Sequence, residues 1–408
     1  MFLFLIFTTL VTWSAYNLYR PIYHHSRLAT VSFLAGWLTG ELALHHILWQ
    51  TVVFALFIWA GAVEGFVAAL ASLLCLASWF AMAWFYFEGD RAKGVVEQAL
   101  ITGLGTDFHS HIAPELQDRF PTEPDYKKIK RPLDLIDPQV EVTKNQPYGS
   151  SGQYLDIYRA KYSGDQCPVL MQIHGGAWTE NMGSKNEQAL PLMNHMALRG
   201  WVCVSVDYRL SPRSTFPEAI VDCKEALVWI KQNIADFGGD PDFVVVTGGS
   251  AGGHLASLLA LTANAPEFQP GFESEDTSLQ GAVPFYGVYD FTDSEGHQPN
   301  DGLLSILEDS VMKLPRDENQ AAYEEVSPAF RIHSEAPPFF IIHGDKDSLV
   351  PVQEARSFAA NLRQTSQQPV AYAEIQGAQH AFEMFPSLRS EHVKHGVEKF
   401  LAWLVSNR

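Results

Sequence analysis

The first 87 residues of this 408-residue chain carry almost no charge. Their charged side chains are Arg20, Arg27, Glu41 and Glu64. Three uncharged stretches, residues 1–19, 42–63 and 65–87, each approach the roughly 20 residues that a helix needs to cross a bilayer. Residues 28–40 are also uncharged, but this run is too short to span alone. We therefore predict that residues 1–87 form a transmembrane helical anchor with about three spans.

A cleavable signal peptide is an alternative interpretation of residues 1–19. It is disfavoured because no basic residue precedes the apolar run and no small-residue cleavage site follows it. A transporter is a second alternative. It is disfavoured because the predicted spans hold hardly any of the internal polar side chains that a transport path requires. An anchor is therefore the preferred interpretation.

Basic residues beside the predicted spans indicate their orientation. Arg20 and Arg27 follow the first span, and Arg91 and Lys93 follow the last. Three spans place both pairs on the same side of the membrane, which the positive-inside tendency makes the cytoplasm. We therefore expect an integral membrane protein whose C-terminal part faces the cytoplasm. An even number of spans would place that part outside.

The rest of the chain carries the entire net charge of −18. Nucleic-acid binding needs a basic footprint, so this acidity argues against DNA or RNA as a partner. Four cysteines do not make a disulfide framework, and we expect buried thiols of the kind found in a reducing compartment. The pairs His24-His25 and His45-His46 lack the i, i+4 spacing of two metal ligands on a helix. We therefore expect no metal and no cofactor.

Beyond residue 87 the pattern changes. Residues 88–149 are rich in charge and proline, and we interpret them as a linker with possible cap helices. From residue 150 to residue 408, short apolar runs alternate with helical patterns. The predicted strands are 153–159, 168–173, 201–206, 243–247, 281–286, 338–342 and 370–375. One predicted helix face consists of Ile220, Cys223, Leu227, Ile230 and Ile234. This alternation predicts an α/β fold with a mostly parallel sheet, helices on both faces and a polar insertion at 291–335.

The run from Val244 to His254 contains the motif Gly248-x-Ser250-x-Gly252. Five β-forming residues precede the motif and an apolar helical pattern follows it. A strand that turns sharply into a helix holds its central residue in a strained backbone geometry. The side chain of that residue is then exposed beside the helix N-terminus. The motif predicts that Ser250 is a nucleophile, and a plain strand-to-helix turn is the alternative.

A serine nucleophile needs a base, and the base needs an orienting carboxylate. Asp347 follows the predicted strand at 338–342, and His380 follows the predicted strand at 370–375. Both therefore come after strand ends, where a shared site would form. We predict a catalytic triad of Ser250, His380 and Asp347. Asp345 is the competing acid, and we interpret it as a turn-former.

An ester-cleaving site also needs backbone donors for the oxyanion of the tetrahedral intermediate. The run His174-Gly175-Gly176-Ala177-Trp178 follows the predicted strand at 168–173. Its small residues allow backbone amides to approach a substrate. We predict an oxyanion hole made by Gly176 and Ala177, with Gly175 adjoining and the amide of Ala251 completing it. A tight turn is the alternative.

These motifs together resemble a known family. Residues 150–408 resemble the α/β-hydrolase fold and, within it, the hormone-sensitive-lipase-like serine esterases, which include arylacetamide deacetylase and bacterial carboxylesterases. The matching pieces are His174-Gly175-Gly176, Val206 to Pro212, Gly248 to Gly253, the Asp347 turn and His380. The resemblance implies a Ser-His-Asp triad and an oxyanion hole in the His-Gly-Gly loop. Ala177 replaces the third glycine of many members, and His-Gly-Gly-x-Trp is also similar to kynurenine formamidase, so the substrate stays open.

The combined features predict a membrane-anchored serine carboxylesterase or lipase-like hydrolase that works through an acyl-enzyme. An amide hydrolase of the formamidase or deacetylase type is the alternative. A ligand-binding protein on a hydrolase scaffold is disfavoured by the intact set of Ser250, Asp347 and His380. The expected partners are a small lipophilic ester and the bilayer, the latter through residues 1–87. The sequence leaves the oligomeric state open.

Overall fold

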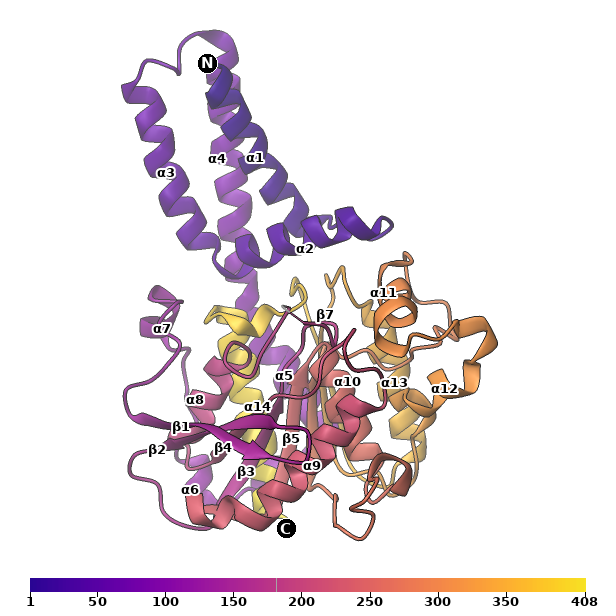
Figure 1. The fold of residues 1–408 in the computed structure, drawn as a ribbon. Helices are drawn as coiled ribbons and strands as arrows, with labels where there is room; N and C mark the ends of the chain where they lie inside the picture. Colours follow the sequence, from indigo (N-terminus) through magenta and orange to yellow (C-terminus); the bar gives the residue numbers. More distant parts are fainter. Residues whose placement is uncertain (181) are drawn as a thin grey trace.

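The computed structural model describes residues 1–180 and 182–408, and it contains an eight-stranded sheet covered by helices (Figure 1). The strands are β1 Val140–Tyr148, β2 Gln153–Ala160, β3 Cys167–Ile173, β4 Val202–Val206, β5 Gly239–Gly249, β6 Gly281–Phe285, β7 Phe339–Gly344 and β8 Val370–Ile375. The helices are α1 Phe2–Tyr19, α2 Ser26–Glu41, α3 Ala43–Trp59, α4 Gly65–Glu88, α5 Ala92–Leu104, α6 Pro114–Gln117, α7 Tyr126–Lys130, α8 Leu190–Leu198, α9 Glu218–Asn233, α10 Ala251–Leu261, α11 Gly302–Ile306, α12 Gln320–Glu325, α13 Val352–Thr365 and α14 Leu388–Ser406.

The strand order explains why the motifs meet. The strands lie in the order β1-β2-β4-β3-β5-β6-β7-β8, and every neighbouring pair from β4 to β8 is parallel. Parallel strands end at one edge of the sheet, so the loops after β3, β5, β6, β7 and β8 emerge together. The predicted α/β fold with a mostly parallel sheet is confirmed.

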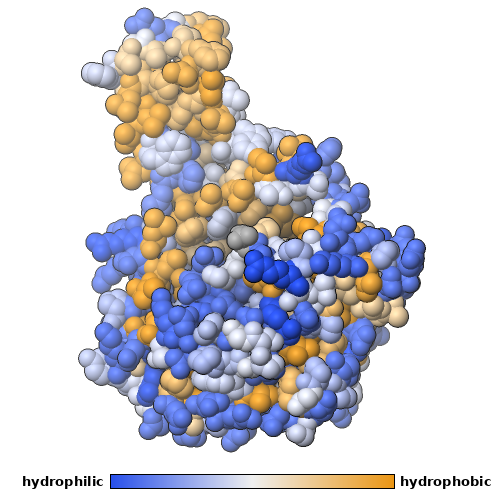
Figure 2. Space-filling model, in the orientation of Figure 1, coloured by the Kyte–Doolittle hydropathy of each residue, from blue (hydrophilic) through white to orange (hydrophobic). Residues whose placement is uncertain are grey.

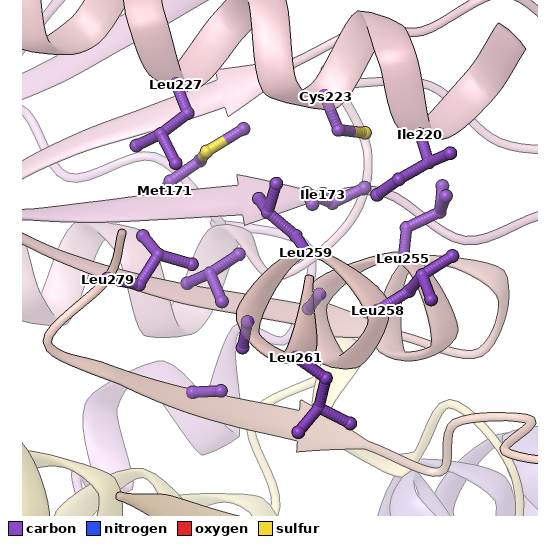
Figure 3. Packing of buried hydrophobic residues seen from close by; sticks show 14 of the residues in the cluster. Met171, Ile173, Ile220, Cys223, Leu227, Leu255, Leu258, Leu259, Leu261 and Leu279 are labelled. Atoms are coloured by element: carbon purple, nitrogen blue, oxygen red, sulfur yellow. The ribbon is translucent and has the colours of Figure 1, made fainter. Parts of the chain in front are cut away.

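The sheet is buried on both faces, because successive side chains along a strand point to opposite sides. On one face, Met171 and Ile173 of β3 pack against α9 and α10 (Figure 3). On the other face, Leu170 packs in a cluster supplied by α5, α8 and α14. The residues Ile220, Cys223, Leu227, Ile230 and Ile234 are fully buried, so the predicted face of α9 is confirmed.

The sheet begins earlier in the chain than the sequence suggested. β1 pairs antiparallel with β2, and a register shift between Thr143 and Gln146 interrupts the pair. This strand is polar and lies at the sheet edge, where one side needs no partner strand, so it lacks the apolar run of the inner strands. The predicted domain start at residue 150 therefore misses a strand.

Helix α5 also lies in the segment that we interpreted as a linker. Its residues Val96 and Leu100 are buried against β8 and α14. A Cβ added to Gly103 would lie 2.6 Å from the Cα of Ala371, so this helix sits directly on the sheet. Residues 88–149 therefore contribute to the core of the α/β domain. The segment 291–335 carries α11 and α12 and no strand among its residues, all of which the structure describes.

The N-terminal helices form a separate layer (Figure 1). Helices α1, α3 and α4 pack side by side, and α2 lies across the end of this bundle next to the α/β domain. Two described helical runs are long and apolar enough to cross a membrane, α1 and Gly65–Leu104. A third is present if α2 and α3, which meet at a 92° bend, form one broken span. Hydrophobic side chains cover the bundle, whereas most of the α/β domain surface is hydrophilic (Figure 2).

Candidate active site

The backbone at Ser250 is strained. β5 ends at Gly249 and α10 begins at Ala251, so Ser250 alone makes the turn, with φ 59° and ψ −122°. A positive φ is uncommon outside glycine and costs free energy that the surrounding packing must supply. The turn is held on both sides, because the amide of Ser250 donates to the carbonyl of Phe285 at 3.0 Å and its carbonyl accepts from the amide of His254 at 3.0 Å. This geometry is that of a nucleophile elbow.

The glycines around Ser250 are required by close approach of other chain segments. A Cβ on Gly248 would lie 2.7 Å from the carbonyl oxygen of Ile173, and one on Gly252 would lie 2.7 Å from that of His174. A Cβ on Gly253 would lie 2.6 Å from the carbonyl oxygen of Phe285. No side chain fits at these positions. The motif therefore brings the ends of β3, β5 and β6 into direct contact.

The predicted acid and base are hydrogen bonded to each other. His380 Nδ1 lies 2.6 Å from Oδ2 of Asp347, and both residues are buried. The other oxygen of Asp347 accepts from the amides of Leu349 and Val350 at 2.9 and 2.8 Å. His343 Nε2 lies 3.3 Å from Oδ2. These contacts fix the position of the Asp347 carboxylate and give both of its oxygens hydrogen-bond partners.

The electrostatics keep Asp347 ionised. Burial alone would raise its pKa, but His380 and His343 act more strongly through charge and hydrogen bonds, and the pKa lies well below the ordinary value. The competing acid Asp345 instead accepts the amide of Gly377 at 2.7 Å, and burial raises its pKa. The structure therefore pairs His380 with Asp347 and gives Asp345 a role in the turn.

Tyr286 connects the nucleophile turn to the base. It follows β6, and its ring lies 4.5 Å from the ring of His380. Its hydroxyl lies 2.6 Å from the point where a Cβ on Gly249 would stand, next to Ser250. Ser250 and His380 therefore border the same tyrosine. The sequence analysis did not single out Tyr286, although its position at the end of a predicted strand is the signal that would have found it.

The His-Gly-Gly loop lies against Ser250. A Cβ on Gly175 would lie 3.1 Å from the Cβ of Ser250. The amide of Gly175, however, donates to the side chain of Gln188 at 2.5 Å, so it is not free to bind an oxyanion in this structure. Gly176 and Ala177 have positive φ values of 112° and 51°. Among the described residues, the amides of Gly176, Ala177 and Ala251 have no internal acceptor.

Residues 207–209 hold this loop in place. Tyr208 donates its hydroxyl to the carbonyl of His174 at 3.0 Å, and its ring stacks on the His174 ring at 4.5 Å. Arg209 is itself fixed by Asp222, which accepts from its side chain at 2.8 to 3.0 Å. This arrangement gives Tyr208 and Arg209 a structural role beside the loop. It also makes the position of the loop depend on a fully buried tyrosine.

A second buried acid lies beside the base. Glu383 accepts a hydrogen bond from the hydroxyl of Tyr286, and its other carboxylate oxygen has no partner among the described residues. Burial raises the pKa of Glu383 to about 7, although the Tyr286 hydrogen bond and the charge of His380 act in the opposite direction. Residue 383 gave no sequence signal, because only the fold brings it to Tyr286. In residues 1–180 and 182–408 no group of His, Cys, Asp or Glu is arranged to hold a metal ion.

A mostly parallel sheet, a serine on a strained strand-to-helix turn and an Asp–His pair after the following strands define an α/β hydrolase. Comparison with known proteins agrees with this class. The sequence matches the BD-FAE family profile over residues 155–362. The chain therefore belongs to the BD-FAE family of α/β-hydrolase esterases.

Two relatives from Mycobacterium tuberculosis (strain ATCC 25618 / H37Rv) are similar over most of the chain. "Probable carboxylic ester hydrolase LipM" is 43% identical over 393 residues, which cover 95% of this chain and 89% of LipM. Esterase LipQ is 42% identical over 341 residues, which cover 81% of this chain and 78% of LipQ. The chain is a carboxylic ester hydrolase, and the predicted enzyme class is confirmed.

A solved structure supports the same class. It is the thermophilic esterase Est2 of the Planctomycetes species Thermogutta terrifontis with bound butyrate. It superposes with a TM-score of 0.50 and 26% identity, covering 60% of this chain and 86% of Est2. Est2 phosphonylated by sarin superposes with a TM-score of 0.51 and 27% identity, covering the same shares of the two chains.

We expect the change Glu383→Gln to flatten the pH dependence of stability between about pH 4.5 and 7. The folded-state pKa lies above the ordinary value of 4.5, so the folded protein binds this proton more tightly than the unfolded chain does. The resulting stabilisation is complete below pH 4.5 and is lost as the pH rises through 7. The raised pKa of Glu383 corresponds to a change of about 3 kcal/mol in the free energy of unfolding across this pH range.

The measurement is urea unfolding of the detergent-solubilised full chain at several pH values, followed by tryptophan fluorescence. Glu325→Gln, at an exposed position, is the matched control and should keep the wild-type slope. If Glu383→Gln also keeps that slope, Glu383 is not the buried proton-binding group that the structure indicates.

Proposed function

We propose that this protein is a membrane-anchored serine carboxylesterase with Ser250, His380 and Asp347 as its catalytic triad. The observation that carries the proposal is the strained turn at Ser250, on the sheet edge where His380 is hydrogen bonded to Asp347 at 2.6 Å. The same hydrogen bond would fix the imidazole tautomer with its proton on Nδ1. Nε2 is then the nitrogen that accepts the serine proton.

The reaction then follows from these positions. Ser250 Oγ attacks the ester carbonyl carbon while His380 takes its proton, and Asp347 stabilises the imidazolium that forms. The amides of Gly176, Ala177 and Ala251 bind the oxyanion, because they are the loop and helix donors without an internal acceptor among the described residues. His380 returns the proton to the leaving alcohol, an acyl-enzyme remains on Ser250, and water hydrolyses it by the same route.

The relatives favour an ester over an amide as the substrate. LipM is named a carboxylic ester hydrolase and LipQ an esterase, and the Est2 structure holds butyrate. No feature of the described site favours an amide. The phosphonylation of Est2 by sarin supports a nucleophilic mechanism in a structurally similar esterase.

We expect Ser250→Ala to lower kcat/KM for p-nitrophenyl butyrate by a factor of about 10³ or more, because the covalent step is lost. The folded structure should be retained, since alanine is smaller and the turn is held by backbone contacts. Ser257→Ala is the matched control, because Ser257 lies in α10, the helix that follows Ser250. Among the described residues its hydroxyl bonds only to the carbonyl of Gly253. Equal activity in the two variants would refute Ser250 as nucleophile.

We also propose that residues 1–87 anchor the protein in a membrane and leave the catalytic domain in the cytoplasm. Helix α1 and the run Gly65–Leu104 are long and apolar enough to span, and the LipM alignment covers 95% of this chain and so includes most of this region. Arg20 ends α1, and Arg91 and Lys93 follow α4. These basic residues lie on the catalytic-domain side if both helices span.

Full-length protein is therefore expected to stay in the membrane pellet after alkaline carbonate washing. A C-terminal green fluorescent protein should be bright and a C-terminal alkaline phosphatase inactive. Release by carbonate would contradict the anchor. An active phosphatase fusion would place the catalytic domain on the opposite side of the membrane.

A further inference from the structure

Helix α2 places aromatic side chains beside the base of the triad. The ring of Phe33 meets the ring of His380 edge-on at 5.8 Å. Trp37, one turn further along α2, stacks on Phe33 at 5.5 Å and on Phe385 at 5.3 Å. Phe33 and Trp37 are only partly buried. An apolar wall from the N-terminal region thus borders the catalytic groups of the α/β domain.

Polar contacts hold α2 over the site at both of its ends. At its start, the side chain of Asn300 donates to the carbonyl of Tyr23 at 2.6 Å. In its first turn, Ala29 accepts a hydrogen bond through its carbonyl from the hydroxyl of Ser348, next to Asp347, at 3.3 Å. At its end, Glu41 forms a buried ion pair with Arg389 at 3.0 Å. The wall is therefore attached to the loop that carries Asp347. Through Arg389, which also donates to the carbonyl of Gln376, it is attached to the loop that carries His380.

A second face of α2 is apolar and free. Leu28, Val31 and Leu34 are 48%, 50% and 46% exposed. Because α2 turns by 92° away from α3, it lies across the end of the bundle (Figure 1). If the bundle spans the bilayer, α2 lies at the membrane surface with these side chains toward the lipid, as interfacial helices do. The catalytic site then opens directly beneath the bilayer.

We propose that α2 forms the wall of the acyl-binding site, and that the acyl chain of an ester dissolved in the bilayer lies along Phe33 and Trp37. This proposal rests on the proposed function of Ser250. Aromatic side chains offer a rigid apolar surface, and each methylene that leaves water for such a surface strengthens binding. A long acyl chain gains from this wall, whereas an acetyl group is too short to use it. Phe33 and Trp37 are thus specificity-determining residues.

The test compares p-nitrophenyl laurate with p-nitrophenyl acetate, using the full chain in phosphatidylcholine nanodiscs. For Phe33→Ala and Trp37→Ala, we expect the loss in kcat/KM on laurate to exceed the loss on acetate at least about tenfold, equivalent to a few methylene contacts. Phe33→Leu should restore most of the preference for laurate. Leu34→Ala, on the free face of α2, is the matched control and should leave both activities within about twofold of wild type.

Equal losses on the two esters in Phe33→Ala and Trp37→Ala would overturn the proposal, as would an equal change of preference in Leu34→Ala. If Phe33→Ala does not fold, the proposal is tested with Phe33→Leu and Trp37→Ala. The criterion is the same ratio of the loss in kcat/KM on laurate to the loss on acetate. Failure of the proposed function would look different. In that case wild type would cleave neither ester, or Ser250→Ala would cleave both as fast as wild type.

Discussion

The turn at Ser250 is the constraint on which the catalytic site depends. A non-glycine residue with φ 59° is stable only if its neighbours leave no other conformation, and here the ends of β3 and β6 touch the turn through glycines that admit no Cβ. The same contacts bring the His-Gly-Gly loop to within van der Waals distance of Ser250. Packing free energy from the buried sheet thus maintains a local strain that exposes the nucleophile.

Arg389 connects the N-terminal helices to the catalytic domain. Its guanidinium pairs with Glu41 of α2, donates to the carbonyls of Phe85 and Gln376, and lies 4.7 Å from the centre of the Phe85 ring. Both charged side chains are at most 2% exposed, so removing either partner would leave an uncompensated buried charge. Gln376 begins the loop that ends at His380. The position of His380, the proposed base, is therefore coupled to the helix that lies beside it.

The proposed catalytic residues could be singled out from the sequence because each follows a strand end in a short local motif. Contacts between distant parts of the chain could not be predicted from the sequence. The pairing of Tyr286 with Glu383 and the place of Phe33 beside His380 exist only after the sheet and α2 are assembled. Gly175 was predicted to adjoin the oxyanion hole, but the side chain of Gln188 occupies its amide, a contact that no local pattern reports. Strand β1 was missed because a polar edge strand lacks an apolar run.

Covalent labelling with an alkyl fluorophosphonate tests the central claim most directly, because the reagent stops at the stage that corresponds to the acyl-enzyme. The full chain would be labelled in membranes, digested and mapped by mass spectrometry. We expect a single phosphonate adduct on Ser250, formed in parallel with the loss of esterase activity. An adduct on any other residue that accounts for the lost activity, or full inactivation with Ser250 unmodified, would contradict a serine hydrolase centred on this turn.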